Sequence, residues 1–349
     1  MIFREIHRKI NTKKALDKEY MFSLFKKRKE KFLARGEKLT DLNIELVRNF
    51  REKFRNMSLK YVLFTTKGKR VFRAKIHKYQ DISEKEWELL NWLRKLSFKQ
   101  GICCPLYYFR PLNIFFYEDV PGISFEELLS QHRIKKLLEI TPRIAKWLKK
   151  FHSTSGKKRF LSVKNLKEEL KERRHWYFLV RKCAPSFYKD FSRLLKDLWK
   201  FRESFSSPES LVHSDFHWGN IIKIKNQKSK IKNQQSIINN KFRVIDFGYA
   251  FYGDPLEDVG GFLAQNDSMF RYYGHGFLKK GREIKEIFLK NYFQKKLSES
   301  EKNRLAYFEI KKILEMAAIL ALVESNEDNK ARGITTLLKE AEKKIERLS

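Results

Sequence analysis

β-Branched and aromatic residues gather in short runs between residues 58 and 122, with polar residues between the runs. Two of these runs, 61–66 (YVLFTT) and 71–76 (VFRAKI), lie on either side of a turn that contains Gly68. Apolar runs joined through a glycine turn are typical of a β-hairpin. Two more strands are expected at 105–109 and 113–117, which predicts a small antiparallel sheet.

One helix is expected between the second and third of these strands. Apolar residues recur at helical spacing from Trp87 to Leu96. Residues Ser83 to Glu86 form a capping-box pattern, which predicts that the helix begins at Ser83 and that the Glu86 side chain returns to the Ser83 backbone N–H. The resulting order, β-β-α-β-β, describes a sheet with one helix.

The remaining pattern is mainly helical. Residues 1–57 are basic, contain no proline and carry apolar residues at mixed helical spacings, which predicts a helical extension. Residues 124–200 and 270–349 also show helical spacing, and short strands are expected at 211–212, 221–222 and 242–245. The pattern therefore predicts a basic helical extension over 1–57, a small sheet domain over 58–122 and a mainly helical domain over 123–349.

Composition excludes several classes of protein. The chain has 349 residues, of which 42% are apolar and 14% aromatic, so it can bury a core and is not a disordered chain. Three cysteines exclude a disulfide scaffold and favour a reducing compartment. The first ten residues alternate charge with apolar side chains, and no apolar run approaches the ~20 residues that span a membrane. A cytoplasmic location is expected.

The charge is strongly positive, with 76 Lys and Arg against 42 Asp and Glu, a net +34. Such a surface attracts nucleic acid, anionic lipid or phosphorylated ligands, although a drift in composition would produce the same excess. The polar insertion at 223–240 (KIKNQKSKIKNQQSIINN) has no acidic or aromatic residue and is expected to form a solvated hairpin tip. Since binding of single-stranded nucleic acid uses aromatic stacking, a nucleic-acid role is not favoured.

Candidate chemistry is concentrated in two segments, 212–220 (VHSDFHWGN) and 244–248 (VIDFG). Transfer of a phosphoryl group from a nucleotide needs a carboxylate that orients the acceptor hydroxyl and takes up its proton. It also needs magnesium, which prefers hard oxygen ligands. Asp215 can supply the base, Asn220 one magnesium ligand and Asp246, at the end of an apolar strand, a second.

These segments resemble the protein-kinase-like phosphotransferases, and more narrowly the aminoglycoside phosphotransferase and choline kinase group. The H-x-D-x-x-x-x-N loop of that group matches His213, Asp215 and Asn220, and its strand ending in I-D matches 245–246. A G-D-P sequence follows at 253–255, and Asp258 matches a further family aspartate. The resemblance covers about residues 58–340.

The resemblance implies a bilobal α+β fold of the protein-kinase type, with a small antiparallel-sheet lobe and a mainly helical lobe. It implies ATP and Mg²⁺ as cofactors, Lys75 as the strand cation that grips the phosphates, and Glu86 as the ion-pair partner of Lys75. This is a second interpretation of Glu86 beside the cap. The same resemblance places the adenine-binding hinge at Glu118, Asp119 and Val120. It also implies structural support from His213, His217, Asp254 and Asp258.

The departures from this pattern favour a small-molecule kinase over a protein kinase. No G-x-G-x-x-G precedes Lys75, Ser214 stands where protein kinases have arginine, and only five residues separate Gly248 from Asp254. The expected acceptor is a hydroxyl of a small molecule or sugar. A polycationic acceptor would need acidic residues, for which the candidates are Asp267, Glu315 and Glu324.

Two alternatives remain open at the level of sequence. One is a membrane-peripheral sugar kinase of the lipopolysaccharide-kinase kind, because a basic surface suits an anionic membrane face. The other is a non-catalytic kinase-like binding protein that holds nucleic acid, which the intact set of Lys75, Asp215, Asn220 and Asp246 argues against.

Overall fold

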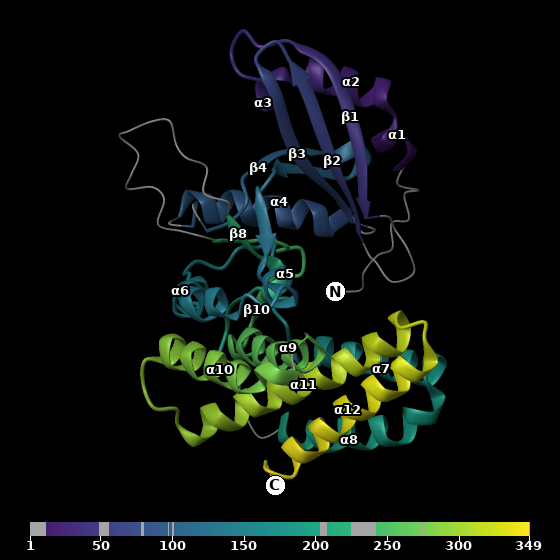
Figure 1. Cartoon of the computed structure of the whole chain (residues 1–349), viewed down its shortest axis with the longest axis vertical. Helices are drawn as coiled ribbons and strands as arrows, with labels where there is room; N and C mark the ends of the chain where they lie inside the picture. The colour runs from purple at the N-terminus through teal and green to yellow at the C-terminus, as the bar shows by residue number, and fades with distance from the viewer. Residues whose placement is uncertain are drawn as a thin grey trace. The chain divides into compact units, whose positions relative to one another are not determined.

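The computed structural model describes residues 12–48, 56–77, 80–96, 98–99, 101–202, 208–224, 242–273 and 275–348. The chain forms two compact units, shown with their elements in Figure 1. Unit 1 comprises Met1–Gly122 and Ile222–Tyr249, and unit 2 comprises Ile123–Ile221 and Ala250–Ser349. Two separate stretches of sequence therefore build each unit.

Unit 1 is built on a five-stranded antiparallel sheet in the order β1-β2-β3-β5-β4. Its strands are β1 (Leu39–Arg48), β2 (Asn56–Thr65), β3 (Gly68–His77), β4 (Pro105–Phe109) and β5 (Ile114–Glu118). The hairpin expected from the sequence is β2–β3, and the two later strands are β4 and β5. A short 3₁₀ helix, η1 (Arg110–Leu112), joins β4 to β5.

Both faces of this sheet are covered. The short helices α1 (Thr12–Leu16), α2 (Lys18–Lys27) and α3 (Lys29–Phe32) lie along one face, as Figure 1 shows. Their apolar side chains join the core formed with the sheet. The shared core includes Phe25, Phe32 and, from the sheet, Phe72 and Phe116. Helix α4 (Gln80–Lys95) buries its own apolar face on β3, β4 and β5. Alternation along β3 directs Phe72 toward the first layer and leaves Lys75 on the opposite face.

The N-terminal segment is only partly helical, which corrects the sequence interpretation. Residues 39–48, predicted as helix, form the edge strand β1, paired with β2. The physical reason is visible in the sequence, because apolar Leu42, Ile44 and Leu46 alternate with polar residues over 41–46. Such a period of two is typical of a half-exposed strand. Among the described residues of this segment, three short helices therefore precede a strand of the main sheet. Residues 1–11 and 49–55 are not described.

The capping box predicted at Ser83 is also wrong. Helix α4 begins at Gln80, so Ser83 lies within its first turn rather than before it. The Ser83 hydroxyl accepts from the His77 N–H and donates to the Asn113 carbonyl, both at 3.3 Å. The Glu86 carboxylate is therefore not a cap and is available to side chains of the sheet.

Unit 2 is mainly helical. Its helices are α5 (Phe125–Ser130), α6 (Ile134–His152), α7 (Leu166–Cys183), α8 (Tyr188–Arg202), α9 (Leu256–Tyr273), α10 (Leu278–Phe293), α11 (Glu299–Val323) and α12 (Glu327–Ile345), with 3₁₀ turns η2 (Pro185–Phe187), η3 (Trp218–Asn220) and η4 (His275–Phe277). Helix α11 packs against α9 on one side and against α7, α8 and α12 on others. Gly260 of α9 permits this close approach, since a Cβ there would lie 2.6 Å from the Glu309 backbone nitrogen.

Short strands position the candidate loops. Strand β7 (Ser210–Val212) leads into the loop at 213–220 and pairs antiparallel with β10 (Phe251–Gly253). Strands β8 (Ile221–Ile224) and β9 (Phe242–Val244) lie on either side of the polar insertion, and β6 (Gly122–Ser124) marks the passage from unit 1 to unit 2. Of the insertion predicted at 223–240, all but its first two residues lie outside the described residues. Within the described part of the chain, no helix has the length and apolar character needed to span a membrane.

Candidate active site

The first group of candidate residues surrounds the Lys75 ammonium, inside unit 1. Lys75 lies on β3 and is buried, and its Nζ is 3.2 Å from both carboxylate oxygens of Glu86 on α4. The same Nζ lies 2.9 Å from Oδ1 of Asp246. The structure therefore brings together three residues that are separated by up to 171 positions in the sequence.

The charged forms of both Lys75 and Glu86 are stabilised in this cluster. Burial lowers the pKa of Lys75, but the carboxylates of Asp246 and Glu86 raise it by more, so the pKa lies above its usual value. Burial raises the pKa of Glu86, whereas the charge of Lys75 and the hydrogen bond from His77 lower it, to about 2. Lys75 is thus cationic and Glu86 anionic at neutral pH, so the two form a buried ion pair.

Asp246 occupies an unusual backbone conformation. It follows β9 through Ile245 and has φ of +68°, in the left-handed region that few residues other than glycine adopt. The next residue, Phe247, donates its backbone N–H to Glu86 Oε1 at 3.1 Å. Strained backbone of this kind persists where the surroundings impose it, and it is concentrated at functional sites. Glu86 thus links the Lys75 side chain to the backbone that carries Asp246.

His77 is a residue of this cluster that the sequence interpretation missed. Its Nε2 lies 2.9 Å from Glu86 Oε2, and the ring is fully buried and meets Tyr249 edge to face. The sequence could have indicated it, because His77 is two residues from Lys75 and residues two apart on a strand share a face. Lys75 and His77 therefore both reach Glu86 from β3.

The hinge candidates at 118–120 lie at the end of β5. Glu118 accepts a hydrogen bond from Arg243 at 3.0 Å, and Asp119 accepts one from Arg73 at 2.7 Å. The Glu118 backbone N–H donates to the Cys104 carbonyl. The side chains of Glu118 and Asp119 thus fix the segment within unit 1.

The second group lies in unit 2, in the loop after β7. The backbone N–H groups of His213 and Ser214 each donate to a different oxygen of Asp258, both at 2.7 Å. Asp258, in the first turn of α9, is buried and also lies 2.9 Å from His152 Nε2. Ser214 has φ of +76°, so this loop, like Asp246, is held in a strained conformation. Asp258 therefore anchors the loop from a neighbouring helix.

Asp215 is presented by this anchored loop. Its Oδ2 accepts a hydrogen bond from Asn220 Nδ2 at 2.9 Å, and the same amide also donates to the Asp215 carbonyl. Since the Asn220 nitrogen faces Asp215, the amide oxygen is the atom directed elsewhere. Burial raises the pKa of Asp215, but the neighbouring His217, through its electrostatic effect and its hydrogen bond, together with the charge of Lys312, outweighs burial and holds the pKa below its usual range. The carboxylate is ionised at neutral pH.

Two histidines brace the loop. The Gly219 N–H donates to His217 Nδ1 at 3.0 Å, which places the ring proton on Nε2, 3.5 Å from Asp215 Oδ2. His213 is fully buried, and its Nδ1 accepts from the Asp215 backbone N–H at 3.3 Å. Both rings therefore orient Asp215 from within its own loop.

Asp254 has a capping role in the structure. Its Oδ1 accepts from the Leu256 N–H at the start of α9, and Arg304 of α11 pairs with its other oxygen at 3.0 Å. Asp254 is buried among these partners. Asp254 and Asp258 together fix the N-terminus of α9 beneath the loop.

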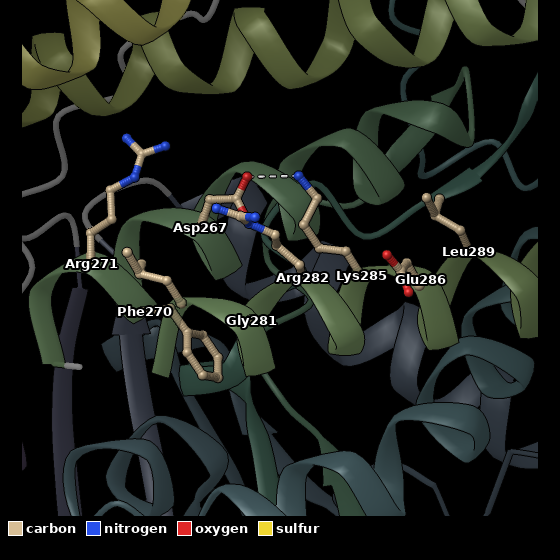
Figure 2. Close-up of a pocket in the computed structure, with 9 residues that line it drawn as sticks. Asp267, Phe270, Arg271, Gly281, Arg282, Lys285, Glu286 and Leu289 are labelled. Atoms are coloured by element: carbon tan, nitrogen blue, oxygen red, sulfur yellow. Dashed lines mark hydrogen bonds and ion pairs between the residues drawn. The ribbon is translucent and has the colours of Figure 1, made fainter. Parts of the chain in front are cut away.

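Two pockets of unit 2 lie on different sides of α9. The smaller, about 310 Å³ with its open mouth included, adjoins the Asp215 loop and is lined by Ser214, Phe216, Glu257, Asp258, Gly261, Gln265, Phe308, Lys311, Lys312 and Glu315. The larger, about 940 Å³ on the same basis, lies between α9 and α10 and contains no residue of the loop. Figure 2 shows the larger pocket, where Asp267 and Lys285 meet at 2.6 Å. The smaller pocket is therefore the one next to the candidate chemistry.

The acidic residues considered for a polycationic acceptor all have partners. Asp267 pairs with Lys285, and Glu315 pairs with Lys312 at 3.2 Å. Glu324 accepts a hydrogen bond from the Asn326 N–H at the end of α11. Asp267 and Glu315 are thus paired with lysines, whereas the partner of Glu324 is a backbone N–H.

Asn220 and Asp246, expected from the sequence to be metal ligands, carry oxygen donors. Among the described residues, no three His, Cys, Asp or Glu side chains form a group that could hold a metal by itself. Magnesium in nucleotide sites needs only one or two protein oxygens, with phosphates and water as its other ligands. The Asn220 amide oxygen and the Asp246 carboxylate are donors of that kind.

This chain is similar to known proteins in its three-dimensional structure. No protein-family model and no curated protein sequence is similar to it. A choline kinase from Cryptosporidium parvum aligns over 95% of this chain and 96% of its own, with a TM-score of 0.60 and 14% identity. The aminoglycoside phosphotransferase APH(2'')-IIa, solved with streptomycin and ATP, aligns over 93% and 96%, with a TM-score of 0.57 and 18% identity. An ethanolamine kinase from Plasmodium vivax aligns over 86% and 82%, with a TM-score of 0.56 and 14% identity.

This chain has the fold of the small-molecule kinases. The match extends over nearly the full length of the choline kinase and of the aminoglycoside phosphotransferase, so the bilobal α+β architecture expected from the sequence is confirmed. At these identities the likeness establishes the fold. Activity must be argued from the residues themselves.

Proposed function

We propose that this protein transfers the γ-phosphoryl group of ATP, with magnesium, to a hydroxyl group of a small molecule or sugar. The observation that carries the proposal is the Asp215 loop, whose His213 and Ser214 backbone N–H groups donate to the Asp258 carboxylate and which is held in a strained conformation. The independent Lys75–Glu86–Asp246 cluster of unit 1 supports it. Phosphoryl transfer needs a carboxylate for the acceptor hydroxyl, which Asp215 can supply. It also needs charged groups for the nucleotide phosphates, which the Lys75–Glu86–Asp246 cluster can supply.

The nucleotide is assigned to unit 1. Lys75 binds the α- and β-phosphates, and Glu86 fixes the direction of the Lys75 side chain. The hinge 118–120 binds adenine through backbone groups, as the family resemblance implies. Because the Glu118 N–H already donates to Cys104, Asp119 and Val120 are the better candidates for this contact.

The metal is assigned to Asn220 and Asp246. When bound, magnesium neutralises charge that develops on the phosphates during transfer. Asn220 offers its amide oxygen because its nitrogen is engaged with Asp215, and Asp246 offers its carboxylate. A neutral and an anionic oxygen ligand leave the remaining positions to phosphate and water.

Asp215 is assigned to the acceptor. Its ionised carboxylate accepts a hydrogen bond from the acceptor hydroxyl, aims the oxygen at the phosphorus and receives the proton as the bond forms. Asn220 and His217 hold the carboxylate in place for this step. A non-catalytic binding protein would have no need for this arrangement.

The test is ATP consumption measured with a panel of hydroxyl compounds that includes aminoglycosides, choline, ethanolamine and core sugars. We expect at least one compound to stimulate turnover, EDTA to abolish it and added Mg²⁺ to restore it. Absence of stimulated turnover across the panel, with ATP binding intact, would favour the non-catalytic alternative.

A second candidate, action at an anionic membrane surface, is favoured by one face of α7. Arg174, Phe178, Arg181 and Lys182 are exposed at helical spacing, and Phe178 is 58% exposed. No acidic residue occurs between Arg173 and Lys182. An exposed aromatic ring surrounded by cations is typical of helices that lie on anionic lipid.

Sedimentation with vesicles tests this second candidate. We expect binding to vesicles that contain phosphatidylglycerol and not to phosphatidylcholine alone. The variant R181Q/K182Q should bind about 30-fold more weakly, since each basic residue contributes about 1 kcal/mol at an anionic surface. The matched control K339Q/K343Q, on exposed positions of α12, should bind like the parent protein. Equal losses in both variants, or binding to RNA in place of vesicles, would contradict the assignment to α7.

A further inference from the structure

The loop that carries Asp215 is bound at both ends by the same helix. At its start, two backbone N–H groups of the loop donate to Asp258 of α9, as described above. At its end, the indole Nε1–H of Trp218 donates to Oδ1 of Asn266, also on α9, at 3.1 Å. Asn266 follows Asp258 by eight residues, about 12 Å along the helix. Helix α9 therefore provides one polar contact for each end of the loop.

Both polar atoms of the Asn266 amide are engaged, and the residue is fully buried. Its Oδ1 accepts from Trp218, and its Nδ2 donates to the Gly281 carbonyl of α10 at 3.1 Å. Helices α9 and α10 approach closely here, since a Cβ on Gly281 would lie 2.9 Å from the Phe270 ring; Figure 2 shows these two residues. A reversed amide would set two donors against each other at Trp218 and two acceptors at Gly281. The orientation of Asn266 is therefore fixed.

The indole ring of Trp218 is buried in an aromatic cluster. Its centroid lies 4.9 Å from that of Phe262 of α9 and 5.8 Å from that of Phe125 of α5. Phe262 in turn stacks on Phe288 of α10 at 4.2 Å. Hydrophobic contacts of this kind bury a ring without a preferred direction. The hydrogen bond to Asn266 is directional and is shielded from water, so it sets the orientation of the indole.

The orientation of this indole bears on Asn220. Trp218 and Asn220 belong to the same 3₁₀ turn, η3, so the indole also fixes the position of that turn. The Asn220 amide must direct its nitrogen at Asp215 and its oxygen away from it, toward the magnesium that the proposed function assigns to it. A displacement of about 1 Å at a reacting group can cost about 100-fold in rate. Asn266 can therefore influence Asn220 through Trp218.

We propose that Asn266 is a positioning residue that orients Trp218 and, through Trp218, holds Asn220 where its amide oxygen binds magnesium. This inference rests on the proposed function and extends it to a residue outside the loop and its motif. Asp258 fixes the start of the loop, and Asn266 fixes the end that carries the metal ligand. The spacing of the two residues on one rigid helix then sets the spacing of the loop ends.

Equilibrium titration of ATP, with Mg²⁺ and with EDTA, tests the inference. N266L keeps the approximate size of the side chain and removes both of its hydrogen bonds, whereas W218F removes only the indole donor. In each variant the tightening of ATP binding by Mg²⁺ should fall about tenfold, the lower end of the loss typical when a group that supports a metal ligand is removed. ATP affinity in EDTA should equal that of the parent protein. W218F keeps the test decisive if N266L does not fold.

Combination with N220A shows whether Asn266 acts through Asn220. N266L should add nothing to the loss of Mg²⁺-dependent tightening that N220A already causes, because an absent amide cannot be misplaced. The matched control is Y307F, which removes a buried hydrogen bond from α11 to Glu169 of α7, elsewhere in unit 2. Y307F should lower the melting temperature, as N266L does, and leave the response to Mg²⁺ unchanged.

The outcomes separate this inference from the proposed function. If N266L and W218F melt at lower temperature but respond to Mg²⁺ like the parent protein, Asn266 serves stability alone. That result would overturn the inference and leave the proposed function intact. Additive losses in N266L and N220A would also overturn it, because Asn266 would then act elsewhere than on Asn220. If Mg²⁺ does not tighten ATP binding in the parent protein, the metal assignment of the proposed function fails and the inference fails with it.

Discussion

Replacement of Asp215 by asparagine is expected to lower kcat by about 10³-fold, within the range that general-base groups contribute. The change keeps the size of the side chain and removes its capacity to accept a proton. ATP binding should be almost unaffected, because the residues assigned to the nucleotide, Lys75 and Asp246, are untouched. Turnover is measured by ATP consumption in the presence of the best acceptor, and nucleotide affinity by equilibrium titration.

The structure makes this variant informative. Asp215 is held by Asn220 and His217 and is carried on a loop that Asp258 anchors, so the loop has support that does not depend on the Asp215 charge. D197N, at an exposed i,i+3 pair on α8, removes a carboxylate elsewhere in unit 2 and should retain full activity. Activity in D215N within a few fold of the parent protein would contradict the assignment of the base.

Much of the candidate site could be predicted from the sequence because its motifs are local. His213, Asp215 and Asn220 lie within eight positions, and their contacts are made largely within that loop. The Lys75–Glu86 pair was predictable only through the family resemblance. The competing interpretation, a capping box at Ser83, assumes that the helix begins there. Helix α4 begins three residues earlier, at Gln80, so Ser83 is not a cap.

Other features could not be predicted because they depend on tertiary contacts. The positive φ of Ser214 and of Asp246 could not be read from residue type, because serine rarely adopts it and aspartate tolerates it in only a minority of cases. His77 binds Glu86 only because the face of β3 meets α4. The edge strand β1 is a different case, since its alternation was present in the sequence and was outweighed by the basic, helix-like composition around it.

The second large effect is expected at Lys75 and Glu86. K75A and E86A should each lower kcat/KM by about 100-fold, comparable to loss of a group that stabilises transition-state charge. The double variant should be hardly worse than either single variant, because removal of one partner already abolishes the function of the pair. Such non-additivity is expected for residues in direct contact. The measurement is a double-mutant cycle on kcat/KM for ATP.

Glu86 has more than one partner, so the cycle also reports on how the cluster works. Besides Lys75, its carboxylate holds His77 and the Phe247 N–H next to Asp246. E86A should therefore destabilise the fold more than K75A does, since it leaves the buried His77 ring and the buried Phe247 N–H without their acceptor and leaves Lys75 with Asp246 alone. Thermal unfolding of both variants, followed by circular dichroism, separates this stability effect from the kinetic one. Additive kinetic effects in variants that remain folded at the assay temperature would show that Glu86 acts on the backbone of Asp246 independently of Lys75.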